Sequence, residues 1–342
     1  MAQSGTDAAA DAGHPRHGGD LAWATRRYGT PEAGWLDLST GINPVPYPAP
    51  QELADALFRL PGRDDLDALI AAASAAYGVP SGTGILAVPG TETAIRLLPL
   101  VAPQGSVAVV SPTYASHAEA WSAAGRAVVA ARSVEDLPAD TAIVVVGNPN
   151  NPDGRMTEPG RLAALARRLG ARGGLLVVDE AFTDAAPDTS LMQELRGLPA
   201  IVLRSLGKFY GLPGLRLGFV AGDATALARL APLLGDWPVS GPAIAVGRAA
   251  LADDGWRTAT RERLARDVDR LHEIVDRHLL EVVGGTDLFL LIDDAAAGQI
   301  HRHLAARGIW TRTFPYEPRW LRLGLPPDHG FDRVDAALAG IR

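Results

Sequence analysis

Between residues 106 and 205 the sequence alternates short apolar runs with segments of helical periodicity, and this alternation restricts the possible folds most strongly. The apolar runs are SVAVVSP, TAIVVVGNP, GLLVVDEAF and AIVLRS, at residues 106–112, 141–149, 174–182 and 200–205. Strands that are apolar throughout are buried on both faces, and helices between them supply the crossovers of a parallel sheet. We therefore expect an α/β fold with a mostly parallel central sheet.

Each apolar run ends in a polar stretch or in one rich in glycine and proline. In open α/β sheets, ligands bind beyond the carboxyl ends of the strands. The stretches GNPNNP, DEAF and RSLGK lie at such ends. We therefore expect the functional site at this edge of the sheet.

The composition restricts the class of protein. Of the 342 residues, 47% are hydrophobic and 21% are charged, which is typical of a globular chain with a large core. The net charge of −7 argues against a nucleic-acid-binding surface, and the absence of cysteine excludes disulfides, thiolate chemistry and cysteine-ligated metals. No apolar run reaches the ~20 residues of a membrane helix, and the first residues lack the pattern of a signal peptide. We expect a soluble cytoplasmic protein without a metal site.

The sequence predicts an N-terminal arm and two domains. Residues 1–44 form the arm, whose first small and polar residues we expect to be disordered and whose remainder we expect to pack with the small domain. Residues 45–236 form the large domain. Residues 237–342 contain a long charged amphipathic helix at 257–281, followed by strand, helix and strand, which predicts a smaller α+β domain.

A possible anion site lies in VPGTETAIRLL at residues 88–98, where Gly90 precedes Thr91 and Glu92 at the start of a helical pattern. The free N–H groups and hydroxyls of such a helix start bind phosphate, although simple N-capping explains the pattern equally well. Tyr114 follows a predicted strand, where its ring can stack on a flat ligand or merely cover the edge of the core.

Asn148 and Asp179 each follow an apolar strand. A carboxylate at the position of Asp179 can pair with a buried cation such as a protonated ring nitrogen, or can serve as an N-cap or a surface acid. The amide of Asn148 can donate a hydrogen bond into a site at the end of the sheet, although Asn-Pro is also an ordinary turn sequence.

Lys208 lies in RSLGKFYGLPGLRLGFVAG at residues 204–222, a stretch that is apolar and rich in glycine. A lysine that is desolvated in such surroundings has a lowered pKa and a nucleophilic amine, which forms Schiff bases; a solvated loop lysine is the alternative. Arg216 in the same stretch can supply a second cation near a phosphate.

Together these residues meet the requirements of one cofactor, pyridoxal 5′-phosphate (PLP). They provide a phosphate-binding helix start, a stacking ring, an amide, a carboxylate for a pyridine nitrogen and a lysine for the aldehyde. Each lies beside the end of a strand, and chance does not readily place all of them there. The set therefore predicts a PLP-dependent enzyme.

The motifs GNPNNPDG, VVDEAF and SLGKFYGLPGLRLG resemble those of fold-type I PLP-dependent enzymes, in the branch of the histidinol-phosphate aminotransferases and threonine-phosphate decarboxylases. The resemblance runs from about residue 14 to residue 342. HGGD, WLDLSTGINPVPYP and KFYGLPGLRLGF make it closer to the threonine-phosphate decarboxylases of cobalamin biosynthesis. It implies an aminotransferase-like fold type I and a homodimer with sites at the subunit interface.

The resemblance also implies a role for each motif residue. Lys208 is the implied Schiff-base lysine, Asp179 the partner of the pyridine nitrogen, Asn148 the donor to O3′, and Tyr114 the residue stacked on the ring. The residues implied around the cofactor phosphate are Gly90, Thr91, Glu92 through its backbone, Ser205 and Arg216.

Substrate contacts are implied at four further positions. Arg322 in WLRLGLP resembles the arginine that binds the substrate carboxylate through two parallel hydrogen bonds. Arg312 and His17 are candidates for the substrate phosphate, and Asn43 is a further substrate-binding candidate.

Three positions depart from the family pattern. Gly207 stands where relatives often have serine or threonine, which removes a hydroxyl from the phosphate site. Phe182 stands where aminotransferases of this branch usually have tyrosine, which favours the decarboxylases. Leu60 stands where many relatives have a tyrosine that reaches the partner subunit's cofactor phosphate, and leucine cannot make that contact.

The resemblance predicts decarboxylation of L-threonine O-3-phosphate to (R)-1-amino-2-propanol O-2-phosphate in cobalamin biosynthesis. The alternative is a histidinol-phosphate-type aminotransferase, in which the same residues break the Cα–H bond instead of the Cα–carboxylate bond. The sequence does not decide which bond is oriented for cleavage. A DNA-binding regulator is disfavoured because the acidic chain has no room for a basic helix-turn-helix.

Overall fold

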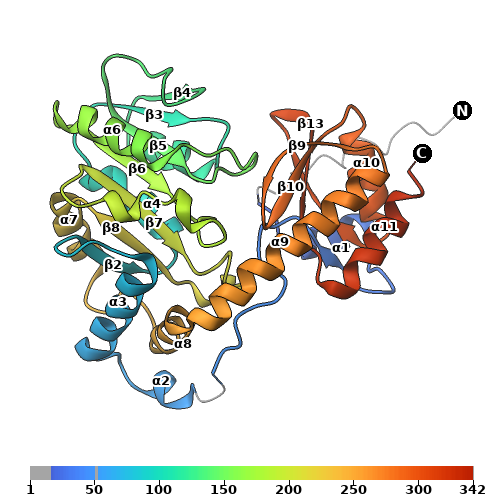
Figure 1. The fold of residues 1–342 in the computed structure, drawn as a ribbon, viewed down its shortest axis with the longest axis horizontal. Coiled ribbons are helices and arrows are strands. Elements are labelled where there is room, and N and C mark those ends of the chain that lie inside the picture. Colours follow the sequence, from blue (N-terminus) through green and yellow to red (C-terminus); the bar gives the residue numbers. More distant parts are fainter. Residues whose placement is uncertain (1–16, 51–52, 342) are drawn as a thin grey trace, which may run out of the picture. The chain divides into compact units, whose positions relative to one another are not determined.

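The computed structural model describes residues 17–50 and 53–341, and its chain divides into two compact units (Figure 1). The larger unit comprises Ile42–Arg270 and Gly284–Leu288. The smaller unit comprises Leu271–Val283 and the described parts of Met1–Gly41 and Phe289–Arg342. The first residues, predicted to be disordered, lie outside the described residues.

A seven-stranded sheet forms the core of the larger unit, with the strand order β2-β8-β7-β6-β5-β3-β4. Its strands are β2 (Gly84–Val88), β3 (Ser106–Val110), β4 (Val128–Ala131), β5 (Thr141–Gly147), β6 (Leu175–Asp179), β7 (Ala200–Ser205) and β8 (Gly218–Gly222). Strands β3 to β7 pair in parallel, whereas β8 is antiparallel to both of its neighbours. The predicted mostly parallel sheet is confirmed.

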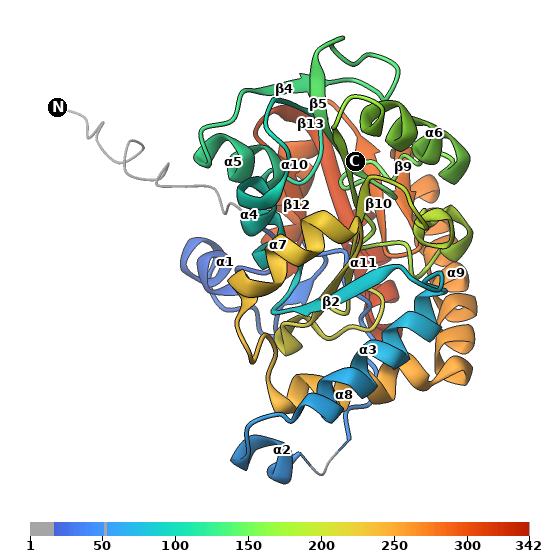
Figure 2. The same ribbon diagram turned by 90° about the vertical axis from the view of Figure 1, so that its left-hand side faces the viewer.

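Both faces of the central strands are buried because helices cover them. Val145, Val177 and Leu203 join a hydrophobic cluster with residues of α4 (Thr91–Val101), α5 (Ser116–Ala123) and α7 (Ala224–Leu234). On this face α4 lies beside α7 (Figure 2). The intervening Val144, Val178 and Val202 point to the opposite face and are also buried. This two-sided burial explains why these strands are apolar throughout.

The remaining helices of the larger unit are α2 (Ala54–Phe58), α3 (Arg63–Tyr77), α6 (Pro159–Gly170) and α8 (Gly241–Ala252), and α9 (Asp254–Arg277) begins there. Helix α8 packs against α3, and a Cβ on Gly247 would lie 3.1 Å from Cδ1 of Leu69. Because of this close packing the larger unit extends beyond the domain boundary expected at residue 236.

The smaller unit is built on a four-stranded sheet of order β12-β13-β10-β9. Its strands are β9 (Glu281–Thr286), of which the last residues belong to the larger unit, β10 (Phe289–Asp293), β12 (Arg312–Phe314) and β13 (Glu317–Gly324). Its helices are α1 (Leu21–Tyr28), α10 (Ala297–Ala305) and α11 (Phe331–Leu338). The short strand β1 (Leu36–Asp37) pairs in parallel with β11 (Ile309–Trp310), which joins the N-terminal segment to this unit. None of the described helices is long and apolar enough to span a bilayer.

Candidate active site

The start of α4 and the segment before β8 form an anion-binding corner in the larger unit. Gly90 caps α4 with a left-handed φ of 79°, and a Cβ at this position would lie 2.6 Å from Nη2 of Arg216. A Cβ on Gly218 would lie 3.0 Å from the backbone nitrogen of Thr91. The first N–H groups of a helix have no acceptor within the helix, and a guanidinium beside them adds positive charge. The fold thus brings together two predicted phosphate-binding motifs that are distant in sequence.

Arg216 reaches this corner with an unusual backbone conformation. Its φ of 52° and ψ of 50° are left-handed, and a non-glycine residue pays roughly 1–2 kcal/mol for that conformation. Its Nη1 donates a hydrogen bond to the carbonyl oxygen of Pro213 at 3.3 Å. Such strain occurs most often at functional positions. Ser205 is brought to the same corner, because it pairs in register with Gly218.

Asp179 ends β6, and both oxygens of its buried carboxylate accept hydrogen bonds. Its Oδ2 lies 2.9 Å from Nε2 of His117, and its Oδ1 accepts a hydrogen bond from the backbone nitrogen of Ala181 at 3.1 Å. An ionised carboxylate only accepts, so Nε2 of His117 is the donor. His117 is itself buried, at 1% exposure, and orients the carboxylate. Sequence reasoning missed this histidine. Its place three residues after Tyr114, in the helix that follows the strand end, was a possible signal that it lies at the site.

Tyr114 connects Asp179 with the anion-binding corner. Its hydroxyl donates a hydrogen bond to Oε2 of Glu92 at 3.2 Å, and its ring meets that of His117 edge-on at a centroid distance of 6.2 Å. Burial raises the pKa of the Tyr114 hydroxyl, and the charges of Glu92 and Asp179 raise it further. Tyr114 is therefore a neutral donor at neutral pH. The structure thus joins the predicted stacking ring to both neighbouring parts of the site.

Lys208 lies in the turn after β7, and Asp179 lies at the end of the neighbouring β6. Asp179 pairs in register with Leu203, so the carboxylate and the lysine-bearing turn occupy the same edge of the sheet. The side chain of Lys208 is half-buried, and its Nζ lies 5.7 Å from the ring centroid of buried Phe182. The aromatic ring of Phe182 thus forms an apolar neighbour of the amine.

In the structure, the amide of Asn148 bonds to the protein itself. Its buried Nδ2 donates to the carbonyl oxygen of Thr189 at 2.9 Å, and its Oδ1 accepts from the backbone nitrogen of Thr157 at 2.7 Å. The amide of Asn150 is also used by the protein, because its Nδ2 donates to the carbonyl oxygen of Pro112 at 3.0 Å. Asn151, which follows in the same turn and is half-buried, was not singled out in the sequence.

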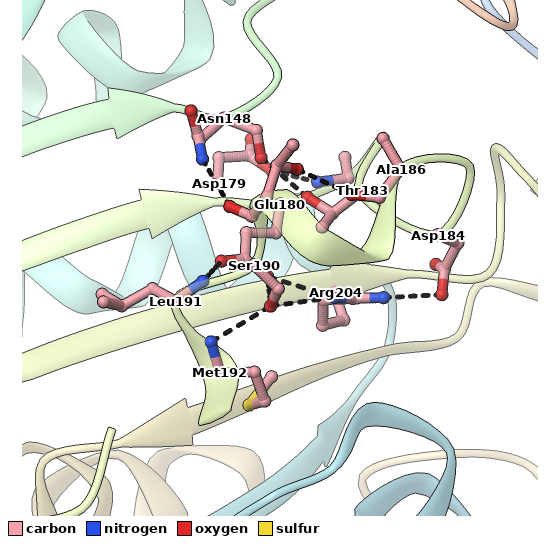
Figure 3. Close-up of polar contacts among 12 residues, drawn as sticks. Asn148, Asp179, Glu180, Thr183, Asp184, Ala186, Ser190, Leu191, Met192 and Arg204 are labelled. Carbon is pink, nitrogen blue, oxygen red and sulfur yellow. Dashed lines mark hydrogen bonds and ion pairs between the residues drawn. The ribbon is translucent and has the colours of Figure 1, made fainter. Parts of the chain in front are cut away.

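A buried ionic cluster underlies the same edge of the sheet (Figure 3). Nη1 of Arg204 lies 3.1 Å from Oε2 of Glu180, and its Nη2 lies 2.6 Å from Oδ1 of Asp184. Glu180 also accepts hydrogen bonds from the hydroxyl of Ser190 and the backbone nitrogen of Leu191. Burial raises the pKa of the Glu180 carboxyl, although Arg204 opposes this shift. The cluster connects β7 to the turn after β6, and sequence reasoning missed it.

In the smaller unit, Arg322 and Arg312 lie directly opposite each other on β13 and β12. Side chains opposed in this way lie on the same face of the sheet, where like charges repel unless an anion binds between them. Burial, and then the charge of Arg312, lowers the pKa of Arg322 to about 10, and burial also lowers that of Arg312. Nη2 of Arg322 donates to the carbonyl oxygen of Ser39 at 2.7 Å.

The HGGD motif is held near Ser39 in the same unit. The backbone nitrogen of Gly19 donates to Oγ of Ser39 at 2.7 Å, and a side chain on Gly18 would collide with the Ser39 carbonyl. His17 itself is exposed. The fold therefore brings the segment that carries His17 close to the residue bound by Arg322.

Asn43 belongs to the larger unit and is buried, with its amide engaged by the protein. Its Nδ2 donates to the carbonyl oxygen of Phe209 at 2.8 Å, and its Oδ1 accepts from Nη2 of Arg263 at 2.6 Å. These partners leave the predicted substrate contact of Asn43 without structural support.

The residues of the larger unit fit PLP. Lys208 follows β7, Asp179 ends β6, and the Tyr114 hydroxyl is bonded to Glu92 at the start of α4. The absence of a side chain on Gly90 leaves room for the Arg216 guanidinium at the helix start, where an anion binds well. An amine, a carboxylate, a ring and a phosphate site are thus available to one cofactor.

Comparisons with known proteins agree with this fold and site. The family model described as "Aminotransferase class I and II" matches residues 43–341. The chain is similar to a protein of Pseudomonas aeruginosa named threonine-phosphate decarboxylase, with 45% identity over 95% of this chain and 98% of that protein. It is also 43% identical to a protein of the same name from a Sinorhizobium species, over 93% of this chain and 95% of that protein.

Among solved structures, the histidinol-phosphate aminotransferase of Clostridium acetobutylicum aligns with a TM-score of 0.81 at 18% identity, over 90% of this chain and 98% of that one. This likeness shows a shared fold. The match to the family model covers most of the sequence, and two relatives are more than 40% identical over nearly their whole length. The chain belongs to the aminotransferase class I and II family.

Proposed function

We propose that this protein is a PLP-dependent decarboxylase that converts L-threonine O-3-phosphate to (R)-1-amino-2-propanol O-2-phosphate. The observation that carries the proposal is the 45% identity to the threonine-phosphate decarboxylase of Pseudomonas aeruginosa over 95% of this chain. The set of Lys208, Asp179 and the anion-binding corner supports the same reaction, because it matches the needs of the cofactor.

Bound PLP supplies an electron sink for the pair of electrons that remains when a bond to the substrate Cα breaks. Lys208 would bind the cofactor aldehyde through its amine. Asp179, whose carboxylate lies 2.9 Å from Nε2 of His117, would hold a proton on the ring nitrogen. Tyr114 would contact the ring, and Arg216 would bind the phosphate together with the first N–H groups of α4.

We assign the contact with the cofactor O3′ to Asn151 instead of Asn148. The side chains of Asn148 and Asn150 are fully buried and bond to backbone carbonyls, whereas the side chain of Asn151 is half-buried. Asn151 is the third asparagine of this turn at the carboxyl end of β5, and its amide supplies the same chemistry.

The proposed substrate has two anionic groups, a carboxylate and a phosphate. Arg322 and Arg312 supply two guanidinium groups on one face of a sheet, and burial lowers the pKa of each. We assign the carboxylate to Arg322 and the phosphate to Arg312, with His17 as a further phosphate contact. Lys208 is the proposed donor of the proton that would replace the carboxylate on the substrate Cα.

The test is to incubate the purified holoenzyme separately with threonine phosphate and with histidinol phosphate plus 2-oxoglutarate. Release of CO2 with formation of aminopropanol phosphate in the first reaction supports the proposal, provided that Lys208→Ala abolishes it. Formation of glutamate in the second reaction, without CO2 in the first, refutes it in favour of an aminotransferase. The homodimer, the cytoplasmic location and the link to cobalamin biosynthesis stay predictions.

A further inference from the structure

A segment at the end of the predicted N-terminal arm runs along the turn that carries Lys208. The backbone nitrogen of Asn43 donates to the carbonyl oxygen of Lys208 at 3.0 Å, and that of Tyr47 donates to the carbonyl oxygen of Tyr210 at 2.9 Å. The contact is close, since a Cβ on Gly211 would lie 2.7 Å from Cα of Pro46. We name residues 42–47 the strap and residues 206–212 the lysine loop; both belong to the larger unit.

Asn43 anchors two successive carbonyl groups of the lysine loop. Its backbone nitrogen binds the carbonyl of Lys208, and its Nδ2 donates to the carbonyl of Phe209 at 2.8 Å. The two peptide groups that flank Phe209, the first of which follows Lys208, are thereby each held by Asn43. Because the orientation of the first peptide group determines ψ of Lys208, Asn43 restricts the direction in which the lysine side chain leaves the loop.

The amide of Asn43 is in turn held by a helix. Nη2 of Arg263 on α9 donates to its Oδ1 at 2.6 Å, and the backbone nitrogen of Val45 donates to the same oxygen at 3.0 Å. Nη1 of Arg263 pairs with Asp267 one turn further along the helix at 2.8 Å. These bonds determine which end of the amide faces Phe209, since two donors occupy the oxygen and leave the nitrogen to donate.

We propose that Asn43 is a positioning residue that fixes the lysine loop for catalysis, with Arg263 orienting its amide. The inference rests on the proposed role of Lys208 as the cofactor-binding lysine. It replaces the predicted contact between Asn43 and the substrate. The two roles differ in their consequences, because a substrate contact acts mainly on KM, whereas misplacement of Lys208 lowers kcat.

The informative variant is Asn43→Asp. It keeps an acceptor for Arg263 and Val45 but replaces the donor to Phe209 by an oxygen that repels the carbonyl. In the protein without cofactor, hydrogen exchange at the Gly211 and Leu212 amides, which bond within the lysine loop, is expected to accelerate about tenfold. In the holoenzyme, kcat is expected to fall by about the same factor while KM changes less than about twofold.

Two matched controls accompany this variant. Val45→Ala changes an exposed side chain of the strap and keeps its backbone hydrogen bonds, and Arg266→Met changes an exposed arginine on the same helix as Arg263. Both are expected to behave like the wild type. Arg263→Met is expected to accelerate hydrogen exchange in the lysine loop and to lower kcat, as Asn43→Asp does. If the Asn43 variant does not fold, the result for Arg263→Met tests the inference instead.

Unchanged exchange in the lysine loop of Asn43→Asp overturns the inference, as does a tenfold rise in KM at constant kcat, which indicates substrate binding. Absence of decarboxylation by the wild type refutes the proposed function. The positioning role of Asn43 is then tested by the hydrogen-exchange measurement. In that case the rate at which Lys208 binds added PLP, followed by absorbance, replaces kcat. It is expected to fall in Asn43→Asp and to match the wild type in both controls.

Discussion

Substitution of Arg204 by methionine is expected to destabilise the protein strongly. Its side chain is 4% exposed, and its two partners, Glu180 and Asp184, are 0% and 3% exposed. Methionine is similar in length but leaves two buried carboxyl groups without their cation. Breaking a buried ion pair in this way costs about 3–5 kcal/mol, a large share of the roughly 5–15 kcal/mol by which proteins are stable.

The matched control is Arg161→Met, which removes an arginine from an exposed ion pair with Glu135. These two side chains are 59% and 55% exposed. An exposed pair contributes roughly 0–1 kcal/mol. The assay is urea unfolding of each variant at several pH values, with the free energy of unfolding obtained by linear extrapolation. Near pH 7 we expect Arg204→Met to lose at least about 3 kcal/mol and Arg161→Met less than about 1 kcal/mol.

The pH dependence follows from Glu180. Burial raises the pKa of its carboxyl in the folded protein above the unfolded value, so the folded protein favours the protonated form. The protonated Glu180 carboxyl stabilises the folded protein fully at pH values below its pKa in the unfolded chain. This stabilisation is lost as the pH rises through its pKa in the folded protein. Loss of Arg204 removes the cation that opposes this shift, so the defect of Arg204→Met should shrink as the pH falls from 7 towards 5. If Arg204→Met lost no more free energy of unfolding than Arg161→Met, or if its loss grew as the pH fell, this expectation would be refuted.

Three further predictions concern the cofactor site. Arg216→Gly, which removes the guanidinium and suits the left-handed backbone, should weaken PLP binding about tenfold to hundredfold as measured by absorbance titration; unchanged affinity would place the phosphate elsewhere. His117→Phe should lower kcat by about tenfold to hundredfold and alter the spectrum of bound PLP, because Asp179 loses its donor; a change in stability alone would assign His117 to packing. Asn151→Ala should change the PLP spectrum with little effect on stability, whereas Asn148→Ala should lower the melting temperature with little spectral change; the reverse result would restore Asn148 to O3′.

Local patterns in the sequence were sufficient to predict much of the fold. The apolar runs at β5, β6 and β7 predicted buried parallel strands, because burial on both faces requires apolar side chains at every position. The antiparallel pairing of β8 with β2 and β7 was not predicted. The pairing with β2 joins segments that are distant in the chain, and the pattern of a single strand indicates neither its neighbours nor its direction.

The site was predicted unevenly for a related reason. Lys208 and Asp179 stand out because each is a charged residue at the end of an apolar run. His117 and Arg204 do not stand out, because an isolated histidine or arginine becomes informative only when its buried partner is known. Asparagines 148, 150 and 151 are equivalent in sequence, and only the structure shows that the side chains of Asn148 and Asn150 are fully buried whereas that of Asn151 is half-buried.

Side-chain patterns alone were thus enough to predict the α/β class, the edge of the sheet at which the candidate site lies, and the set of chemical groups that a PLP enzyme needs. These properties depend on side-chain type and on spacing along the chain, which are local. The folded chain was needed to show that Arg216 lies at the start of α4, that His117 lies beside Asp179, and that Asn43 bonds to the lysine loop. Each of these contacts joins distant segments, and a buried polar group takes its role from the partner that the fold places beside it.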